Sequence, residues 1–272
     1  MIAPMNPHAH HRPSTSPVGF GTIALFVILS FACCQCGGSN ESGWERVQRT
    51  GMLRVGTDAT YPPFESIDTA TGQVIGFDAD LVTEVCRDLG CAPEFVVVPF
   101  DGIIAGLVSG KYDMIASTFT ITPERARQVA FSDSYYDGGQ AIAVPIYDSS
   151  VQSVDDLTGL RIGVQLGTTG ERRAREIPRA ELVLFENIGA AFIDMENGRL
   201  DAVITDLPTA ELIVRQRAYS RVAGPPLTSE QYGLAVRLED ADLLLQINRA
   251  LSAIVSDGRY EKIHDRWFGA GG

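Results

Sequence analysis

From Leu53 onward the chain alternates short β-branched runs with amphipathic stretches of helical periodicity. This alternation is typical of a layered α/β fold, because a helix between two strands returns the chain to the start of the next parallel strand. The sequence therefore predicts an α/β fold. The expected strands are LRVGT, EFVVVP, YDMIAS, QAIAVP, RIGVQ, LVLF, DAVIT and YGLAV.

Several helices between these strands have recognisable starts. Asp78 precedes one amphipathic stretch and Asp101 precedes another, while Thr122 is followed by a proline, which favours the first turn of a helix. Ser153 with an acid three residues later resembles a capping box. The last two expected helices are ADLLLQINRALSAIVSDG and YEKIHDRWFG.

The charge of the chain argues against binding to a nucleic acid. Its 272 residues carry a formal net charge of −12, and the only Lys or Arg before Cys33 is Arg12. A protein that contacts a phosphate backbone needs an excess of cations on its surface. With 45% hydrophobic residues the chain is globular, and its length suits one large or two modest domains.

The N-terminal segment predicts export. Val18 to Ala32 is an uncharged, mostly apolar run of signal-peptide length, shorter than a membrane span. We expect residues 1–32 to be a signal peptide and 33–44 a flexible tether. Cys33 follows Ala32 directly, which makes it the lipidation candidate of a lipoprotein, and plain secretion is the alternative. Either way the folded part is periplasmic or otherwise extracytoplasmic.

Cys86 and Cys91 lie five positions apart near the end of an expected helix. An oxidising compartment would allow them to form a disulfide, and two free thiols are the alternative. Metal binding is not expected, since no histidine lies near either residue in the sequence.

Two breaks suggest that the chain leaves one domain and later returns to it. Ser134 to Gln140 and Gly224 to Gly233 are rich in turn-forming residues, and each can serve as a hinge segment. If both connect the same two lobes, lobe one comprises 45–137 plus 232–272 and lobe two comprises 140–226.

The motifs of common catalytic sites are missing from the sequence. There is no G-x-S-x-G, Walker loop, H-E-x-x-H or G-x-G-x-x-G after a strand. Three of the four histidines precede Cys33, and the fourth is His264. Histidine-dependent hydrolysis and zinc chemistry are therefore not expected, and no metal or cofactor is predicted. Catalysis by carboxylates stays open.

Polar residues gather where four expected strands end, which is where open α/β sheets bind ligands. Arg125 can hold a carboxylate with two parallel bonds, and the main-chain N–H groups around Thr168 and Thr169 can assist it. Asp206 can then accept the α-ammonium group, so the set suits a zwitterion. Each residue also has a structural alternative: Arg125 as a surface ion pair, the threonines and Asp206 as helix caps. The four segments are GTDATYPPFES, ASTFTITPER, GVQLGTTGER and DAVITDLPTAEL.

At these segments the sequence resembles the solute-binding proteins of ABC importers for polar amino acids, in particular the lysine/arginine/ornithine-binding and histidine-binding proteins of solute-binding protein family 3. The match runs from about Leu53 to Phe268. It implies a two-lobed periplasmic binding protein fold of type II, with two hinge strands and the ligand in the cleft between the lobes. It also implies a monomer that delivers its ligand to a permease in the inner membrane.

The resemblance assigns roles residue by residue. Arg125 would bind the ligand carboxylate with main-chain groups of Thr120 and Thr169, and Asp206 would bind the α-ammonium. Around the head group and side chain it implies further ligand-binding residues, namely Asp58, Tyr61, Phe100, Ser117, Thr118, Gln165 and Thr168.

Asp58 is the expected selector, because a buried carboxylate that faces the ligand needs a cation to offset its desolvation. Tyr61 and Phe100 can enclose an aliphatic stem or a guanidinium. Gln165 and Gly170 differ from the usual residues of the family, so side-chain selectivity stays open.

The hypothesis is an amino-acid-binding protein that closes on arginine, lysine, ornithine or histidine, and not an enzyme. The rival is a periplasmic arogenate or prephenate (cyclohexadienyl) dehydratase, a class that resembles these binders. Such an enzyme needs a proton donor at the substrate ring, and Glu211 is the nearest candidate.

Overall fold

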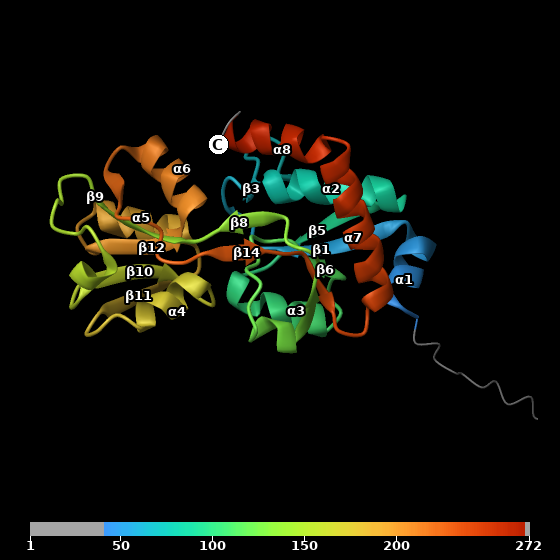
Figure 1. Ribbon diagram of the computed structural model, residues 1–272, viewed down its shortest axis with the longest axis horizontal. Coiled ribbons are helices and arrows are strands. Elements are labelled where there is room, and N and C mark those ends of the chain that lie inside the picture. The colour runs from blue at the N-terminus through green and yellow to red at the C-terminus, as the bar shows by residue number, and fades with distance from the viewer. Residues whose placement is uncertain (1–40, 270–272) are drawn as a thin grey trace, which may run out of the picture. The chain divides into compact units, whose positions relative to one another are not determined.

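Two five-stranded sheets, each flanked by helices, organise residues 41–269, the part of the chain that the computed structural model describes (Figure 1). The predicted α/β fold is confirmed. The expected signal peptide, Cys33 and residues 34–40 of the expected tether lie outside the described residues. None of the helices within 41–269 is long and apolar enough to cross a lipid bilayer.

The first sheet has the strand order β5-β1-β6-β15-β7. Strand β1 runs parallel to β5 and β6, whereas β15 is antiparallel to both of its neighbours. A small three-stranded sheet, β2-β3-β4, follows β1. The elements of this lobe are α1 (Gly43–Thr50), β1 (Met52–Thr57), β2 (Thr60–Tyr61), β3 (Glu65–Ile67), β4 (Val74–Ile75), α2 (Phe77–Leu89), β5 (Ala92–Val97), η1 (Phe100–Gly102), α3 (Ile103–Val108), β6 (Met114–Ile115), η2 (Arg125–Arg127), β7 (Val129–Phe131), β15 (Ala235–Arg237), α7 (Ala241–Ser256) and α8 (Arg259–Phe268).

The second sheet has the order β11-β10-β12-β9-β13, with β10 parallel to its neighbours and β9 antiparallel to its own. Its core is built from the β-branched residues that predicted the strands, among them the buried Val144, Ile162 and Ile204. The elements of this lobe are β9 (Gln140–Pro145), η3 (Val154–Leu157), β10 (Arg161–Gln165), α4 (Thr169–Arg175), β11 (Glu181–Phe185), α5 (Ile188–Glu196), β12 (Ala202–Asp206), α6 (Leu207–Arg217) and β13 (Ser220–Ala223).

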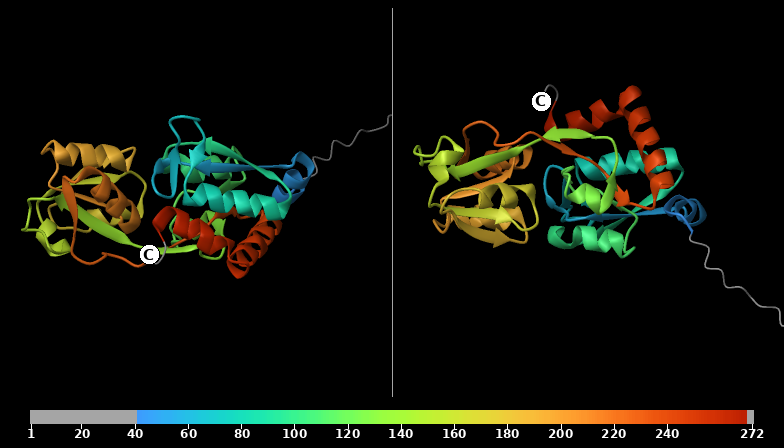
Figure 2. Two further views of the ribbon diagram at one scale, coloured as in Figure 1. Left: turned by 90° about the horizontal axis from the view of Figure 1, so that it is seen from above. Right: turned by 60° about the horizontal axis from the view of Figure 1, so that its bottom comes forward.

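The chain passes between the two sheets twice. It leaves the first sheet after β7, forms the whole second sheet, and returns to the first sheet at β15. The two crossings contain β8 (Tyr136–Gly138) and β14 (Glu230–Tyr232), which pair antiparallel. Figures 1 and 2 show this pair between the two sheets. The two turn-rich breaks in the sequence thus coincide with the two crossings.

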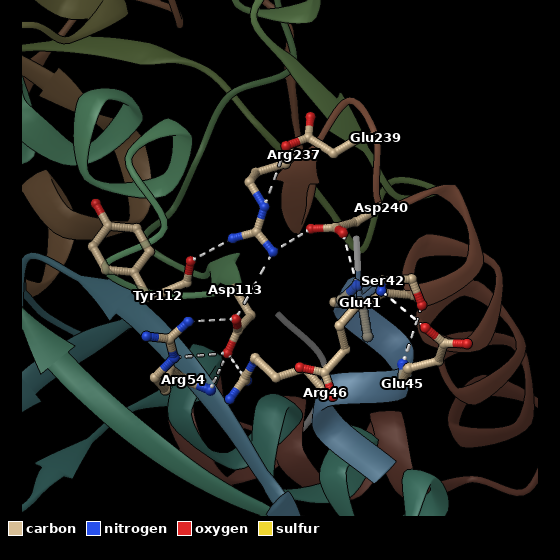
Figure 3. Close-up of polar contacts among 12 residues, drawn as sticks. Glu41, Ser42, Glu45, Arg46, Arg54, Tyr112, Asp113, Arg237, Glu239 and Asp240 are labelled. Carbon is tan, nitrogen blue, oxygen red and sulfur yellow. Dashed lines mark hydrogen bonds and ion pairs between the residues drawn. The ribbon is translucent and has the colours of Figure 1, made fainter. Parts of the chain in front are cut away.

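Helix α1 lies partly within the segment predicted to be a tether. Ser42 caps this helix and exchanges hydrogen bonds with Glu45 in a capping box, so residues 43–44 are helical. Helix α1 is joined to the first lobe through Asp113, a fully buried carboxylate that forms ion pairs with Arg46 of α1 and Arg54 of β1. Arg237 forms an ion pair with Asp240 at 2.6 Å in the same network (Figure 3). Buried charges of this kind need such partners to offset their desolvation.

The helix expected after Thr122 is reduced to the single turn η2. Its first bonds form as predicted, since the Thr122 hydroxyl accepts from Arg125 N at 3.1 Å. The chain then enters β7 at Val129, which leaves no room for a second turn. Asp78 was expected to precede α2 as its cap, but the N-cap is Gly76, two positions earlier, and α2 begins at Phe77. The capping box at Ser153 is confirmed, on the short helix η3.

Candidate ligand site

All eleven residues that the sequence singled out for the site line one cavity, together with one further residue. The space within it, with open solvent at its mouth included, is about 280 Å³. It is lined by residues of both lobes, namely Asp58, Tyr61, Glu65, Phe100, Ser117, Thr118, Thr120, Arg125, Gln165, Thr168, Thr169 and Asp206.

The strand ends bring these residues together. Asp58 directly follows β1, and Ser117 to Thr120 follow β6, its parallel neighbour. In the second lobe Thr168 and Thr169 follow β10, and Asp206 ends β12, which is parallel to β10. Because parallel strands end at the same edge of a sheet, each lobe presents its loops on one side.

Arg125 is the cation of the cavity. Its guanidinium donates to the carbonyls of Thr120 (2.9 Å) and Gly167 (3.2 Å), one from each lobe. It also lies over the rings of Phe119 (4.3 Å to the centroid) and Phe100 (5.4 Å). Burial lowers the pKa of Arg125 to about 10, so the group stays charged at neutral pH. The arrangement excludes the alternative of an exposed ion pair.

Asp206 is a buried carboxylate surrounded by donors. Tyr61 and Tyr232 donate their hydroxyls to it, and Gln140 Nε2 donates at 3.0 Å. Its side chain makes no capping bond to α6, although a helix cap was the alternative. Burial is the main reason why the pKa of Asp206 is raised to about 6. A cationic group in the cavity would favour the charged form.

The pKa of Asp206 predicts how the stability of the ligand-free protein depends on pH. The folded value of about 6 exceeds the ordinary value of 3.8, so this carboxyl stabilises the fold when protonated and loses that contribution as pH rises through about 6. From pH 7 to pH 5 the free energy of unfolding should therefore gain about 1 kcal/mol from Asp206. Burial also raises the pKa of Asp78 to about 6, so this carboxyl contributes to the pH dependence in the same direction.

Urea unfolding of wild type and Asp206→Asn at pH 5, 6 and 7 measures this contribution. As pH falls from 7 to 5, the free energy of unfolding of the wild type should rise relative to that of Asp206→Asn. A difference that is independent of pH would contradict the prediction.

Asp58 and Gln165 face each other across the two lobes. Asp58 Oδ2 accepts from Gln165 Nε2 at 2.9 Å and from the Thr60 hydroxyl at 2.6 Å. Burial, the largest cause, raises the pKa of Asp58. The other amide atom of Gln165, the buried Oε1, has no hydrogen-bond partner among residues 41–269. A ligand with several N–H donors would satisfy both acceptors at this end of the cavity.

Glycines allow close approach around the second-lobe loop. Gly167 has φ 80°, and a Cβ there would lie 3.0 Å from Asp101 Cα of the first lobe. At Gly170, one of the departures from the usual family pattern, a Cβ would lie 2.6 Å from Gln140 Oε1. The glycine therefore leaves room for Gln140 beside Asp206. Thr168 caps α4 by accepting from Glu171 N at 3.1 Å.

Glu65 is a cavity residue that sequence reasoning missed. Its oxygens accept from the hydroxyls of Ser117 (2.8 Å) and Thr118 (3.0 Å), so it fixes both residues of the expected head-group site. Behind it, Asp78 accepts from Thr118 N at 2.8 Å. Burial followed by the nearby Asp78 charge raises the pKa of Glu65 well above its usual range. Glu65 belongs to GTDATYPPFES, but nothing in its spacing identified it.

The expected proton donor of a dehydratase lies elsewhere. Glu211 lines a second cavity formed by α6, α8 and β8, where its neighbours include Tyr136 and His264. It is not among the residues that line the first cavity. Its assignment as a donor to a ligand in the first cavity is therefore wrong.

Cys86 and Cys91 are both free thiols in the structure, Cys86 buried and Cys91 partly buried. The sequence left a disulfide and two free thiols open, and the structure has the free thiols; pairing in an oxidising compartment stays a prediction. Within residues 41–269 no group of three or more His, Cys, Asp or Glu is arranged to hold a metal ion.

Comparison with known proteins supports the same interpretation. Residues 53–270 match the model of a family described as bacterial extracellular solute-binding proteins, family 3. The ABC transporter arginine-binding protein 1 of Escherichia coli K12 is 37% identical over 222 residues, which cover 79% of this chain and 90% of that protein.

Solved structures are similar over most of the chain. An ancestral arginine-binding protein bound to arginine is 43% identical with a TM-score of 0.78, covering 80% of this chain and 99% of its own. An ancestral amino acid-binding protein described as a precursor of cyclohexadienyl dehydratase is 40% identical with a TM-score of 0.79, covering 84% of this chain and 100% of its own. The two-lobed fold of these proteins is the fold of this chain.

Proposed function

The chain belongs to family 3 of the bacterial extracellular solute-binding proteins, and on this premise we propose that it is the extracytoplasmic amino-acid-binding component of an ABC transporter. Its ligand is a basic L-amino acid: arginine first, with lysine, ornithine and histidine as the other candidates. The names of an arginine-binding relative and of an arginine-bound structure support this ligand class.

The observation that carries the proposal is the balance of charge in the cavity. Arg125 is the one cation among the lining residues, and it shares the cavity with the carboxyl groups of Asp58 and Asp206. The third carboxyl group, that of Glu65, is already held by the hydroxyls of Ser117 and Thr118. A zwitterion alone would bring one charge of each sign, and the excess of carboxyl groups would stay unbalanced. A basic amino acid brings a second cation, which offsets the desolvation of Asp58. The unpartnered Gln165 Oε1 beside Asp58 favours a guanidinium, which offers five donors.

Binding proceeds by hinge closure. Asp58 and Arg125 belong to the first lobe, whereas Thr169 and Asp206 belong to the second, so only the closed form contacts the whole ligand. A ligand shifts the equilibrium toward the state that it binds better, which is here the closed state. The closed protein then delivers the amino acid to the permease in the membrane.

The remaining parts of the assignment belong to the same proposal. The lobes comprise 45–137 plus 232–272 and 140–226, a division that the strand order supports. The protein is an exported monomer without catalytic activity, attached to the membrane through a lipid on Cys33 or released after cleavage of residues 1–32.

A thermal-shift panel tests the function. The protein is unfolded and refolded to remove carried-over ligand and is then mixed with each common amino acid, ornithine, cystine and prephenate. A ligand that binds only the native state stabilises it by about 4 kcal/mol at a thousandfold excess over its Kd. We expect arginine to give the largest rise in melting temperature. A rise with neutral amino acids alone would overturn the basic-ligand assignment.

The dehydratase alternative rests on the 40% identity to the precursor protein. Prephenate is an anion, and the carboxyl groups of Asp58 and Asp206 in the cavity would repel it. The panel separates the two functions. If no amino acid raises the melting temperature and prephenate is consumed over time, the protein is the dehydratase and not the binding protein.

A further inference from the structure

Glu230, the first residue of β14, lies where both lobes and a hinge crossing meet. Its Oε2 accepts from the hydroxyl of Thr169 at 2.8 Å and from that of Thr120 at 2.9 Å. Gln140 Nε2 approaches the same oxygen at 3.5 Å, and Oε1 accepts from the Thr228 hydroxyl at 2.9 Å. One carboxylate therefore receives donors from three distant segments of the chain and from its own segment.

The two threonines connect Glu230 to the ligand cavity. Thr120 lies in the first lobe and Thr169 in the second, and both line the ligand cavity together with Arg125. Thr120 also supplies the carbonyl that holds the Arg125 guanidinium. Glu230 does not line the cavity itself, so any effect on the ligand must act through these neighbours.

The contact depends on how the lobes are arranged. Donors from the two lobes converge on one oxygen, so the lobes cannot move apart without breaking at least one of the two bonds. Thr120 and Thr169 are 5% and 7% exposed, and water would replace the carboxylate only after separation. An interaction present in the closed state alone stabilises that state.

Charge adds to the geometry. Glu230 is the strongest of the carboxylates whose attraction opposes the effect of burial on the pKa of Arg125. It thereby helps to keep the buried guanidinium charged. Hydrogen bonds from neutral hydroxyls to an ionised carboxylate are also stronger than those to a neutral amide.

We propose that Glu230 is a positioning residue that latches the closed form, holding Thr120 of one lobe and Thr169 of the other around the bound amino acid and thereby slowing its release. The proposal rests on the proposed function. It adds a device for closure to the residues that contact the ligand.

Stopped-flow and calorimetric measurements on Glu230→Gln test the latch, with L-arginine as the ligand. Glutamine keeps the shape of glutamate but lacks its charge and one of its acceptor oxygens. Losing a hydrogen bond to a charged group should weaken arginine binding about tenfold. We expect this loss in the dissociation rate, with the association rate and the melting temperature of the ligand-free protein close to wild type. Glu239→Gln is the matched control, because it makes the same change at a carboxylate of the first lobe that is 72% exposed.

A double-mutant cycle identifies the partners. Thr169→Val should also speed dissociation, and Thr169→Ser, which keeps the hydroxyl, should recover most of that loss. If Glu230 acts through Thr169, adding Thr169→Val to Glu230→Gln should change the dissociation rate much less than it does in wild type.

Two results would overturn the latch. One is a wild-type dissociation rate in Glu230→Gln, and the other is full additivity with Thr169→Val. Binding of arginine by wild type and Glu239→Gln shows that the proposed function holds, so either result then counts against the latch alone. If neither protein binds any amino acid, the proposed function fails and the latch fails with it.

Discussion

Arg125→Ala should weaken arginine binding by about a thousandfold, because removing one partner of a desolvated charge pair costs roughly 4 kcal/mol. The ligand carboxylate would enter a cavity that then contains the carboxyl groups of Asp58, Glu65 and Asp206 but no cation among its lining residues. Isothermal titration calorimetry measures the loss directly. Arg125→Lys should recover only part of it, since lysine keeps the charge but not the planar pair of donors.

Arg127→Ala is the matched control for this change. Arg127 lies in the same turn η2, but it is exposed and its guanidinium contacts only the carbonyl of Pro123 at 3.4 Å. The Arg127→Ala protein should bind arginine with the affinity of the wild type. An Arg125→Ala protein that binds within threefold of wild type would reject the role assigned to Arg125.

The sequence predicted those parts of the site that depend on local order along the chain. Asp58, Thr168 and Asp206 could be found because each stands at the end of a long, recognisable strand. Strand ends of a parallel sheet share an edge, so their position in the sequence already implies their position in space. The same reasoning located the two crossings between the lobes, since turn-forming residues interrupt the pattern there.

The residues that were missed act through contacts between distant segments. Glu65 lies in β3 and Glu230 in β14, strands of only three residues that carry no readable alternation. Glu230 reaches Thr120 across 110 positions of sequence. Acidic residues in short segments are usually solvated, and only tertiary packing makes Glu65 a buried acceptor and Glu230 a half-buried one.

The errors at helix starts have a similar cause. The proline after Thr122 predicted a helix, but the need to place Val129 in the first sheet ended it after one turn. Asp78 was expected to cap α2, and instead its carboxylate accepts from Thr118 N and the Tyr135 hydroxyl. Tertiary hydrogen bonds thus overrode a local preference that is worth only about 1 kcal/mol.

Asp58→Asn should remove the preference for a basic amino acid. Asparagine has nearly the same shape as aspartate and keeps one acceptor oxygen, but it cannot balance the charge of a guanidinium. Hydrogen bonds to charged groups are worth about 1.5–3 kcal/mol, so arginine affinity should fall roughly ten- to a hundredfold. A neutral amino acid such as glutamine should lose little affinity or gain some, because the buried carboxylate no longer needs a cation.

Competition between arginine and glutamine measures this change most directly, because the ratio of their affinities cancels any general loss of stability. Asp133→Asn, which alters an exposed carboxylate of the first lobe, should leave that ratio unchanged. If Asp58→Asn kept the wild-type ratio, Asp58 would not be the selector. Charge discrimination would then rest on Glu65, the other carboxyl of the first lobe that lines the cavity, whose oxygens are already occupied by Ser117 and Thr118.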